Sequence, residues 1–234
     1  MEKRVLFRSA WLPYALVAPQ IAITLVFFFW PATQAVWYSF QLQDAFGLKT
    51  QFVGLQNFAT LFRDENYLAS FKVTALFSVL VAFSGIAISL LFATMADRVL
   101  RGALAYKTLL IWPYAVAPAI AGVLWAFLFA PSIGIVTYML KGFGVDWNWI
   151  IDGDQAMLLV VNCVYAFFDT FGVLDATTQG GPAQATQILV YKVYHDGVKA
   201  ADLGGSSAQS VILMFIVIAL TVAQFRFVER KVQY

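Results

Sequence analysis

The feature that most constrains the fold of this chain is a set of long runs without a charged residue. The four longest contain 35 residues between Arg8 and Asp44, 24 between Lys72 and Asp97, 33 between Lys107 and Lys141, and 23 between Asp202 and Arg226. A bilayer core of about 30 Å needs roughly 20 apolar residues as a helix, so each run can hold one membrane span. Because lipid cannot pair with backbone polar groups, spans form helices or closed barrels. Continuous apolar runs favour helices over the alternating pattern of a barrel.

Composition supports the same class of fold. Hydrophobic residues make up 61% of the 234 residues and charged residues only 12%, whereas a soluble domain has about 25% charged residues. The sequence therefore predicts an all-α, polytopic transmembrane helical bundle, built as a single domain over residues 1–234. Four spans are predicted at 14–36, 73–95, 108–130 and 207–226, and a fifth, marginal one at 156–174.

The distribution of positive charge predicts which segments face the cytoplasm. Three compact basic segments indicate cytoplasmic positions: the N-terminus with Lys3, Arg4 and Arg8, the loop with Arg98, Arg101 and Lys107, and the C-terminus with Arg226, Arg230 and Lys231. Segments 37–72, 131–155 and 175–206 carry acidic residues that match or outnumber the basic ones. These three segments are predicted to be external.

The charge pattern conflicts with one span. Segments 131–155 and 175–206 are both predicted to be external, yet a single hydrophobic stretch, 156–174, separates them. The stretch contains Asn162 and Asp169, and an Asp near the bilayer centre costs at least about 2.5 kcal/mol. Two explanations follow: residues are missing near 158–163, or the stretch re-enters the membrane without crossing it.

Three motifs stand out along the sequence. Val53-Gly54-Leu55-Gln56-Asn57-Phe58 lies in the first predicted external segment, and Pro113-Tyr114-Ala115-Val116-Ala117-Pro118 lies in the third run. The third and most specific motif is Thr178-Gln179-Gly180-Gly181-Pro182, followed by Ala185-Thr186, Leu189 and Tyr191. These motifs resemble those of permease subunits of bacterial ABC importers of the sugar (maltose-type) family. Within this family the chain is most similar to the A-type permeases of sn-glycerol-3-phosphate importers.

The resemblance implies a transport subunit that forms the translocation path by alternating access. It implies sn-glycerol 3-phosphate or glycerophosphodiesters as substrate, with a sugar or oligosaccharide as the alternative. It also implies a second homologous permease, a dimeric ABC ATPase and a periplasmic substrate-binding protein as partners, with no nucleic acid. The implied location is the bacterial cytoplasmic (inner) membrane.

One departure from the family pattern is large. Members of the family have six spans and a cytoplasmic coupling loop with an E-A-A…G motif, which docks on the ATPase. No such motif is present in this sequence. Residues 155–161 resemble the start of the family's fourth span and 162–168 the middle of its fifth. We therefore expect docking of the ATPase to be impaired, and a coupling-defective permease that does not transport is the rival interpretation.

Candidate site residues fall into two groups. Asp169, with its neighbour Thr170, could line the translocation path or could end a helix at the outer interface. The loop motif Thr178, Gly180, Gly181 and Pro182 could cradle a phosphate through backbone N–H groups. A tight turn is favoured instead, because Pro182 has no N–H and no Lys or Arg is adjacent.

Other chemistries lack the residues they need. Cys163 and His195 are the single cysteine and the single histidine, so neither a metal site nor a hydrolytic constellation is expected. There is no Walker-type glycine-rich motif, so ATP would be hydrolysed by a separate subunit. The sequence predicts neither a cofactor nor an enzymatic activity for this chain, and a membrane-embedded enzyme would need a convergent polar cluster that is not found.

Overall fold

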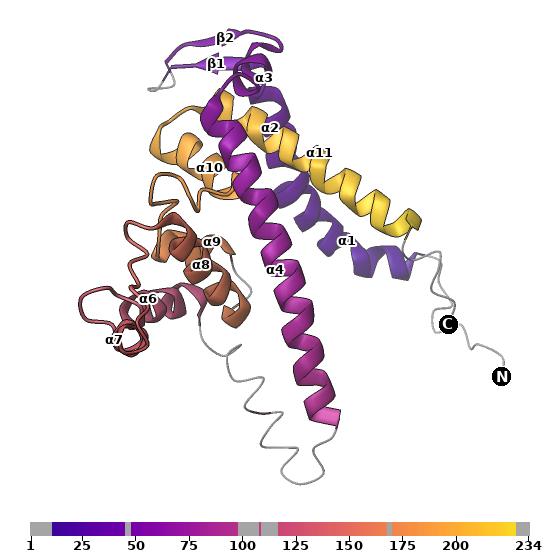
Figure 1. Ribbon diagram of the computed structural model, residues 1–234. Helices are drawn as coiled ribbons and strands as arrows, with labels where there is room; N and C mark the ends of the chain where they lie inside the picture. Colours follow the sequence, from indigo (N-terminus) through magenta and orange to yellow (C-terminus); the bar gives the residue numbers. More distant parts are fainter. Residues whose placement is uncertain (1–10, 45–47, 98–107, 109–116, 168–169, 228–234) are drawn as a thin grey trace, which may run out of the picture. The chain divides into compact units, whose positions relative to one another are not determined.

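The computed structural model describes residues 11–44, 48–97, 108, 117–167 and 170–227. These residues form mainly helices, together with one two-stranded antiparallel sheet (Figure 1). They belong to two compact units, residues 1–61 with 196–234, and residues 62–195. The predicted helical class is confirmed, and the small sheet is an addition that the hydrophobic runs do not predict.

The first unit begins with a continuous helical segment. It consists of α1 (Leu12–Thr24), the π-helical turn η1 (Leu25–Phe29) and α2 (Trp30–Tyr38). The six successive side chains from Leu25 to Trp30 are all apolar and between 52% and 70% exposed. With 3.6 residues per turn, six successive positions cover the whole circumference of a helix. A helix that is apolar on every side belongs in lipid or inside a larger assembly.

A short hairpin follows this helix and is held by one asparagine. Strands β1 (Gln41–Gln43) and β2 (Thr50–Phe52) pair antiparallel, with Gln41 opposite Phe52, and α3 (Gln56–Leu61) follows. The side-chain nitrogen of Asn57, in α3, donates to the carbonyl oxygens of Ser39 (2.9 Å) and Gln41 (2.8 Å). Asn57 is buried, so the motif asparagine ties α3 to the end of α2 and to the start of the hairpin.

Helix α11 (Leu203–Phe227) completes the first unit. It packs against α2, α3 and β1. Its N-terminus approaches the hairpin so closely that a Cβ placed on Gly204 would lie 2.3 Å from the carbonyl oxygen of Gln41. Since that distance is far below van der Waals contact, glycine is required there for α11 to reach the strand.

The second unit is built around α4 (Glu65–Asp97), a helix of 33 residues. Its other helices are α6 (Pro118–Leu128), α7 (Ile135–Gly142), α8 (Gly153–Phe167), α9 (Thr170–Ala176) and α10 (Leu189–Tyr194), after which η3 (His195–Lys199) leads into the first unit. Helices α8 and α10 pack against α4, and α9 packs against α6, α8 and α10. The buried core consists of Phe77, Met157, Leu159, Val160, Val161, Val173, Leu174, Ile188 and Tyr191.

Aspartate caps fix where three of the long helices start. Asp64 accepts a hydrogen bond from the backbone N–H of Asn66 (2.9 Å) at the start of α4. Asp152 and Asp202 accept equivalent bonds from Asp154 and Gly205, at the starts of α8 and α11. Capping residues of this kind satisfy N–H groups that have no partner within the helix. Asp202 also marks the start of a charge-free run, so it delimits an apolar segment as well as a helix.

Three helices are long and apolar enough to cross a membrane within the described ranges: Leu12–Tyr38, Glu65–Met95 and Leu203–Arg226. They contain the predicted spans 14–36, 73–95 and 207–226. The predicted span 108–130 is described mainly from residue 117 onward, where α6 forms a shorter apolar helix. Most of the first half of that span lies outside the described residues. The boundaries of the spans in a bilayer, and the single membrane domain, stay predictions.

The marginal stretch 156–174 contains parts of two helices rather than one long helix. Helix α8 has 15 residues, which at 1.5 Å per residue gives about 22 Å, too short for a bilayer core. A Cβ placed on Gly153, at the start of α8, would lie 2.6 Å from the Cβ of Ala185. Segments 131–155 and 175–206, which the charges assign to one side, therefore meet, as they would if the stretch folded back. The suspected join near 158–163 lies within the continuous backbone of α8.

Candidate functional site

The loop between α9 and α10 contains the most specific motif of the sequence and is held by a buried threonine. The Thr186 Oγ1 lies 2.8 Å from both the Thr178 Oγ1 and the carbonyl oxygen of Gly181. Because a carbonyl oxygen can only accept, the Thr186 hydroxyl donates to Gly181 and accepts from Thr178. Thr186 is 1% exposed, so this short chain of hydrogen bonds closes the loop from the inside.

The glycine-rich turn is tight, as the sequence predicts. Gly180 has a φ of +87° and Gln179 a φ of +51°, both in the left-handed region, where glycine is favoured. The peptide bond between Gly181 and Pro182 is cis. The N–H of Gly181 donates to the carbonyl oxygen of Thr178 (2.8 Å), so it is used within the turn. This pairing favours the turn over the phosphate cradle.

Helix α10 fixes the loop to α4. The backbone N–H of Leu189 donates to the Thr74 Oγ1 (2.8 Å), and the Thr74 hydroxyl lies 2.7 Å from the carbonyl oxygen of Ser70. The phenol of Tyr191, which is fully buried, donates to the Asp175 carboxylate (3.1 Å). The motif loop is therefore anchored at both ends by side chains of the same unit.

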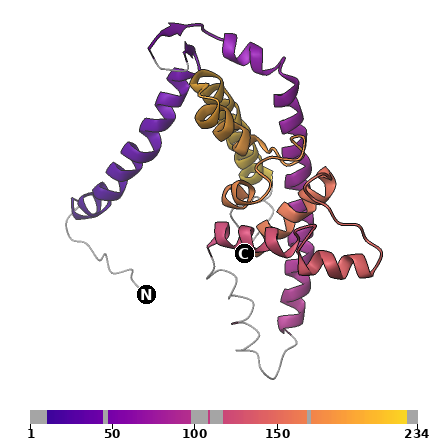
Figure 2. The ribbon, with the colours of Figure 1, turned by 90° about the vertical axis from the view of Figure 1, so that its left-hand side faces the viewer.

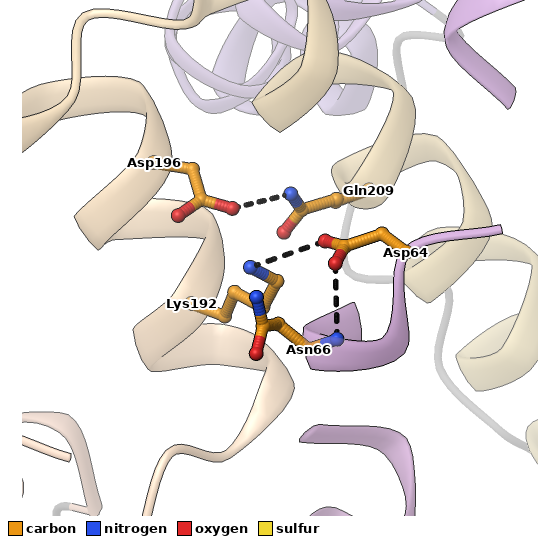
Figure 3. Close-up of polar contacts among 5 residues, drawn as sticks. All are labelled: Asp64, Asn66, Lys192, Asp196 and Gln209. Carbon is orange, nitrogen blue, oxygen red and sulfur yellow. Dashed lines mark hydrogen bonds and ion pairs between the residues drawn. The ribbon is translucent and has the colours of Figure 1, made fainter. Parts of the chain in front are cut away.

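A buried cation lies in α10. Lys192 is only 6% exposed, and its Nζ is 3.8 Å from the Asp64 Oδ2 (Figure 3). The other oxygen of Asp64 accepts from the N–H of Asn66 (2.9 Å), so one carboxylate both caps α4 and faces the lysine. Sequence reasoning counted Lys192 only among the charges of an external segment. Its burial depends on α10 packing along α4, and no local pattern signals that.

A second polar pair lies in the first unit. The Gln209 side-chain nitrogen donates to the Asp196 Oδ2 (2.7 Å), and Gln209 is almost completely buried in α11 (Figure 3). The backbone carbonyl oxygen of Asp196 also accepts from the N–H of Asp202 (2.9 Å). Asp196 therefore fixes the segment that leads into α11. It also gives the side-chain N–H of Gln209 a polar partner within an otherwise apolar helix.

The structure describes the predicted site residues only in part. Asp169 lies outside the described residues. Thr170 begins α9 and is partly exposed, whereas Thr178, Gly180, Gly181 and Pro182 follow the other end of that helix. Among the residues that the structure describes, no group of three or more His, Cys, Asp or Glu side chains could hold a metal ion.

Replacing Thr186 by valine tests the hydrogen-bonded closure of the loop. Valine keeps the shape but loses two hydrogen bonds worth about 1 kcal/mol each, so we expect a destabilisation of about 1–2 kcal/mol. A lower midpoint of thermal unfolding in detergent and faster cleavage of the loop by proteinase K are the expected results. Thr33→Val is the matched control, because the Thr33 hydroxyl bonds only to the nearby Trp30 carbonyl oxygen and is exposed. Equal effects of the two substitutions would contradict the role of Thr186.

The chain is similar to curated proteins along its whole length, although no family model matches it. It is 47% identical over 292 residues to the sn-glycerol-3-phosphate transport system permease protein UgpA of Salmonella typhimurium, covering 100% of this chain and 99% of that protein. UgpA of Brucella abortus is 48% identical over 291 residues, with 99% of each chain covered. UgpA of Yersinia enterocolitica is 48% identical over 287 residues, with 97% of each covered.

Solved structures show the same fold at lower identity. A crystal structure of a bacterial ABC transporter involved in the import of the acidic polysaccharide alginate contains a chain that matches with a TM-score of 0.76. The identity is 18%, and the match covers 95% of this chain and 96% of that one. At this identity the likeness shows the fold alone, which is that of an ABC importer permease.

The alignment lengths bear on the suspected internal gap. The alignment with the Salmonella typhimurium protein extends over 292 positions, whereas this chain has 234 residues, so 58 positions have no counterpart here. Both proteins are covered almost from end to end, and the unmatched positions are therefore internal. With 47% identity to UgpA in an alignment that covers the full chain, the chain belongs to the UgpA family of permease subunits of ABC importers.

Proposed function

We propose that the chain contributes the A-type half of a translocation path for sn-glycerol 3-phosphate or a related glycerophosphodiester. The observation that carries this proposal is the 47% identity, over the whole chain, to a permease named for sn-glycerol-3-phosphate transport. A sugar or oligosaccharide is the alternative, favoured by the alginate-importing transporters that share the fold. The fold does not decide between these substrates, because one fold carries many specificities.

The proposed partners are a second homologous permease, a dimeric ABC ATPase and a periplasmic substrate-binding protein, assembled in the bacterial inner membrane. One solved neighbour, with a TM-score of 0.72 and 18% identity, is an alginate ABC transporter in complex with a substrate-bound periplasmic protein. The exposed apolar helices of the present chain are consistent with such an assembly. Leu25 to Trp30, for example, need lipid or a second subunit to cover them.

The proposed mechanism is alternating access, with ATP hydrolysed by the separate ATPase subunits. A phosphate ester carries negative charge, yet the charge-free runs by definition contain no Lys or Arg. Recognition of the phosphate therefore falls largely to the partner permease or the binding protein, because cationic groups give the strong hydrogen bonds that phosphate requires. This chain would supply the apolar wall of the path and the external loop around Thr178–Thr186.

We also propose that coupling to ATP hydrolysis is impaired. The family's coupling loop has no counterpart among the residues of this sequence, and 58 aligned positions of the relative are unmatched. An ATPase can shift a permease between two states only by binding them differently. Without a docking element that contact is reduced, so the coupling-defective interpretation applies to this chain as it stands.

The substrate is best tested in a chain with the segment restored. The internal segment of the Salmonella typhimurium relative would be inserted between Val161 and Asn162, and the protein reconstituted in proteoliposomes with its second permease, ATPase and binding protein. We expect ATP-dependent uptake of labelled glycerol 3-phosphate that excess unlabelled glycerol 3-phosphate suppresses and maltose does not. Uptake of a labelled oligosaccharide in its place would establish the alternative substrate.

A further inference from the structure

Helix α7 presents an unusual surface for its position after the short apolar helix α6. Four of its exposed positions are apolar: Ile135 (63% exposed), Tyr138 (80%), Met139 (61%) and, directly after the helix, Phe143 (85%). Their spacing of three, four and eight residues from Ile135 places them on one side of a helix. The remaining exposed side chain of the helix is that of Lys141, in its last turn.

Contacts on the other side of α7 fix the orientation of the helix, and with it the direction in which the apolar face points. Thr137, on the opposite side of the helix, is buried. Gly134, just before α7, is packed so tightly that a Cβ there would lie 2.4 Å from the Leu128 carbonyl oxygen and 2.6 Å from the Ala130 nitrogen. The Gly134 N–H also donates to the Ala130 carbonyl oxygen (2.8 Å). The turn between α6 and α7 therefore holds the apolar face outward.

Two observations indicate what covers this face. Helix α6, which six residues separate from α7, also carries exposed apolar side chains at helical spacing, Ile120, Leu124 and Phe127. Figure 2 shows α7 lying across the direction of α4, the membrane-span candidate of the same unit. A helix that lies across the axis of a membrane-spanning helix, and whose outward side is apolar, has the geometry of a helix in the plane of the membrane interface.

We infer that α7 is an interfacial helix that lies on the external face of the inner membrane. It inserts four apolar side chains into the lipid there: Ile135, Tyr138, Met139 and Phe143. Tyr138 suits this depth because its ring is apolar and its hydroxyl polar, as in aromatic belts at membrane surfaces. Lys141 would lay its methylene stem along the apolar surface and reach a lipid phosphate with its amino group. A shallow groove of about 460 Å³ lies beside α7 and is lined by Ser132, Ile133, Thr137, Tyr138 and Lys141, among others. Its lining combines polar and apolar side chains, which suits contact with a lipid headgroup. The role belongs to membrane attachment and does not depend on the substrate.

The test measures the depth of α7 in a membrane by fluorescence quenching. Met139→Cys would be made in a Cys163→Ala background, labelled with bimane and reconstituted as the full chain in phosphatidylcholine–phosphatidylglycerol liposomes that contain nitroxide-labelled lipid. Asp154→Cys, which is exposed and polar within the same predicted external segment, is the matched control. Because interfacial helices insert their apolar face by roughly 5–10 Å, we expect quenching at position 139 to exceed quenching at 154 by about threefold.

Two results would overturn the inference. Equal quenching at positions 139 and 154 would show that the face does not enter lipid. Loss of quenching at 139 when the binding protein and the second permease are added would show that a protein, and not lipid, covers the face. Ile135→Cys provides a second position on the same face, so that a folding defect at one site does not decide the outcome.

Discussion

Proteoliposomes that contain this chain, the second permease, the ATPase and the binding protein are expected to show no ATP-driven uptake of glycerol 3-phosphate. The expected rate equals that of the same vesicles without ATP, and it lies at least about tenfold below the rate of the chain with the restored segment, since coupling between sites is worth about 1–3 kcal/mol. The physical reason is the loss of the contact through which ATPase closure would move the helices. Initial rates of labelled uptake with and without internal ATP provide the measurement.

The comparison with the restored chain makes this result interpretable. Co-purification with the ATPase should fail for the present chain and succeed for the restored one, because the coupling loop is the docking element in the family that the chain resembles. Robust ATP-dependent uptake by the unmodified chain would refute the coupling defect. Failure of both chains to take up glycerol 3-phosphate, with ATPase docking intact in the restored one, would instead contradict the proposed substrate.

Replacing Gly204 by alanine is expected to undo the docking of α11 on the hairpin of the first unit. The added Cβ would lie 2.3 Å from the Gln41 carbonyl oxygen and 3.0 Å from the Asn57 side-chain nitrogen. A backbone oxygen cannot rotate away as a side chain can, and overpacking of this kind typically costs about 1–3 kcal/mol. We expect the midpoint of thermal unfolding, followed by size-exclusion chromatography in detergent, to fall by several degrees.

Gly142→Ala is the matched control for this prediction. Gly142 is the last residue of α7, and a Cβ there would meet no atom within 4 Å. Alanine is favoured over glycine in helices by roughly 1 kcal/mol, so this variant should be as stable as the parent or slightly more so. If Gly204→Ala unfolds at the same temperature as Gly142→Ala, the close approach of α11 to β1 is not a determinant of stability.

Local chemistry is enough to predict the membrane helices and the family. A run such as Leu203–Phe225 has no charge, and the cost of placing apolar side chains in water or charges in lipid is a property of each residue, independent of its partners. The loop motif from Thr178 to Tyr191 identifies the family because its glycines and proline specify a turn locally. The tightness of that turn is confirmed, whereas a role of Asp169 and Thr170 in the path stays a prediction.

Other features depend on contacts between residues far apart in the chain, and these only the tertiary structure decides. The Leu189 N–H bonds to Thr74, 115 residues away, and Asn57 bonds to the carbonyl oxygen of Ser39, 18 residues away. The Leu189–Thr74 bond belongs to the packing of α10 on α4, which buries Lys192. The Asn57–Ser39 bond helps to hold the hairpin of the first unit.

The stretch 156–174 shows most clearly which properties come from the sequence and which from tertiary contacts. Its charges and length are properties of the sequence, and they predict a conflict between the two external segments. The close approach of Gly153 to Ala185 shows that those segments meet in the structure, and α8, with 15 residues, is too short to span a bilayer core by itself. Whether the stretch crosses the membrane stays a prediction. The sequence by itself determined that the chain belongs in a membrane, because each apolar run carries its own preference for lipid, and the tertiary contacts decided which distant segments meet.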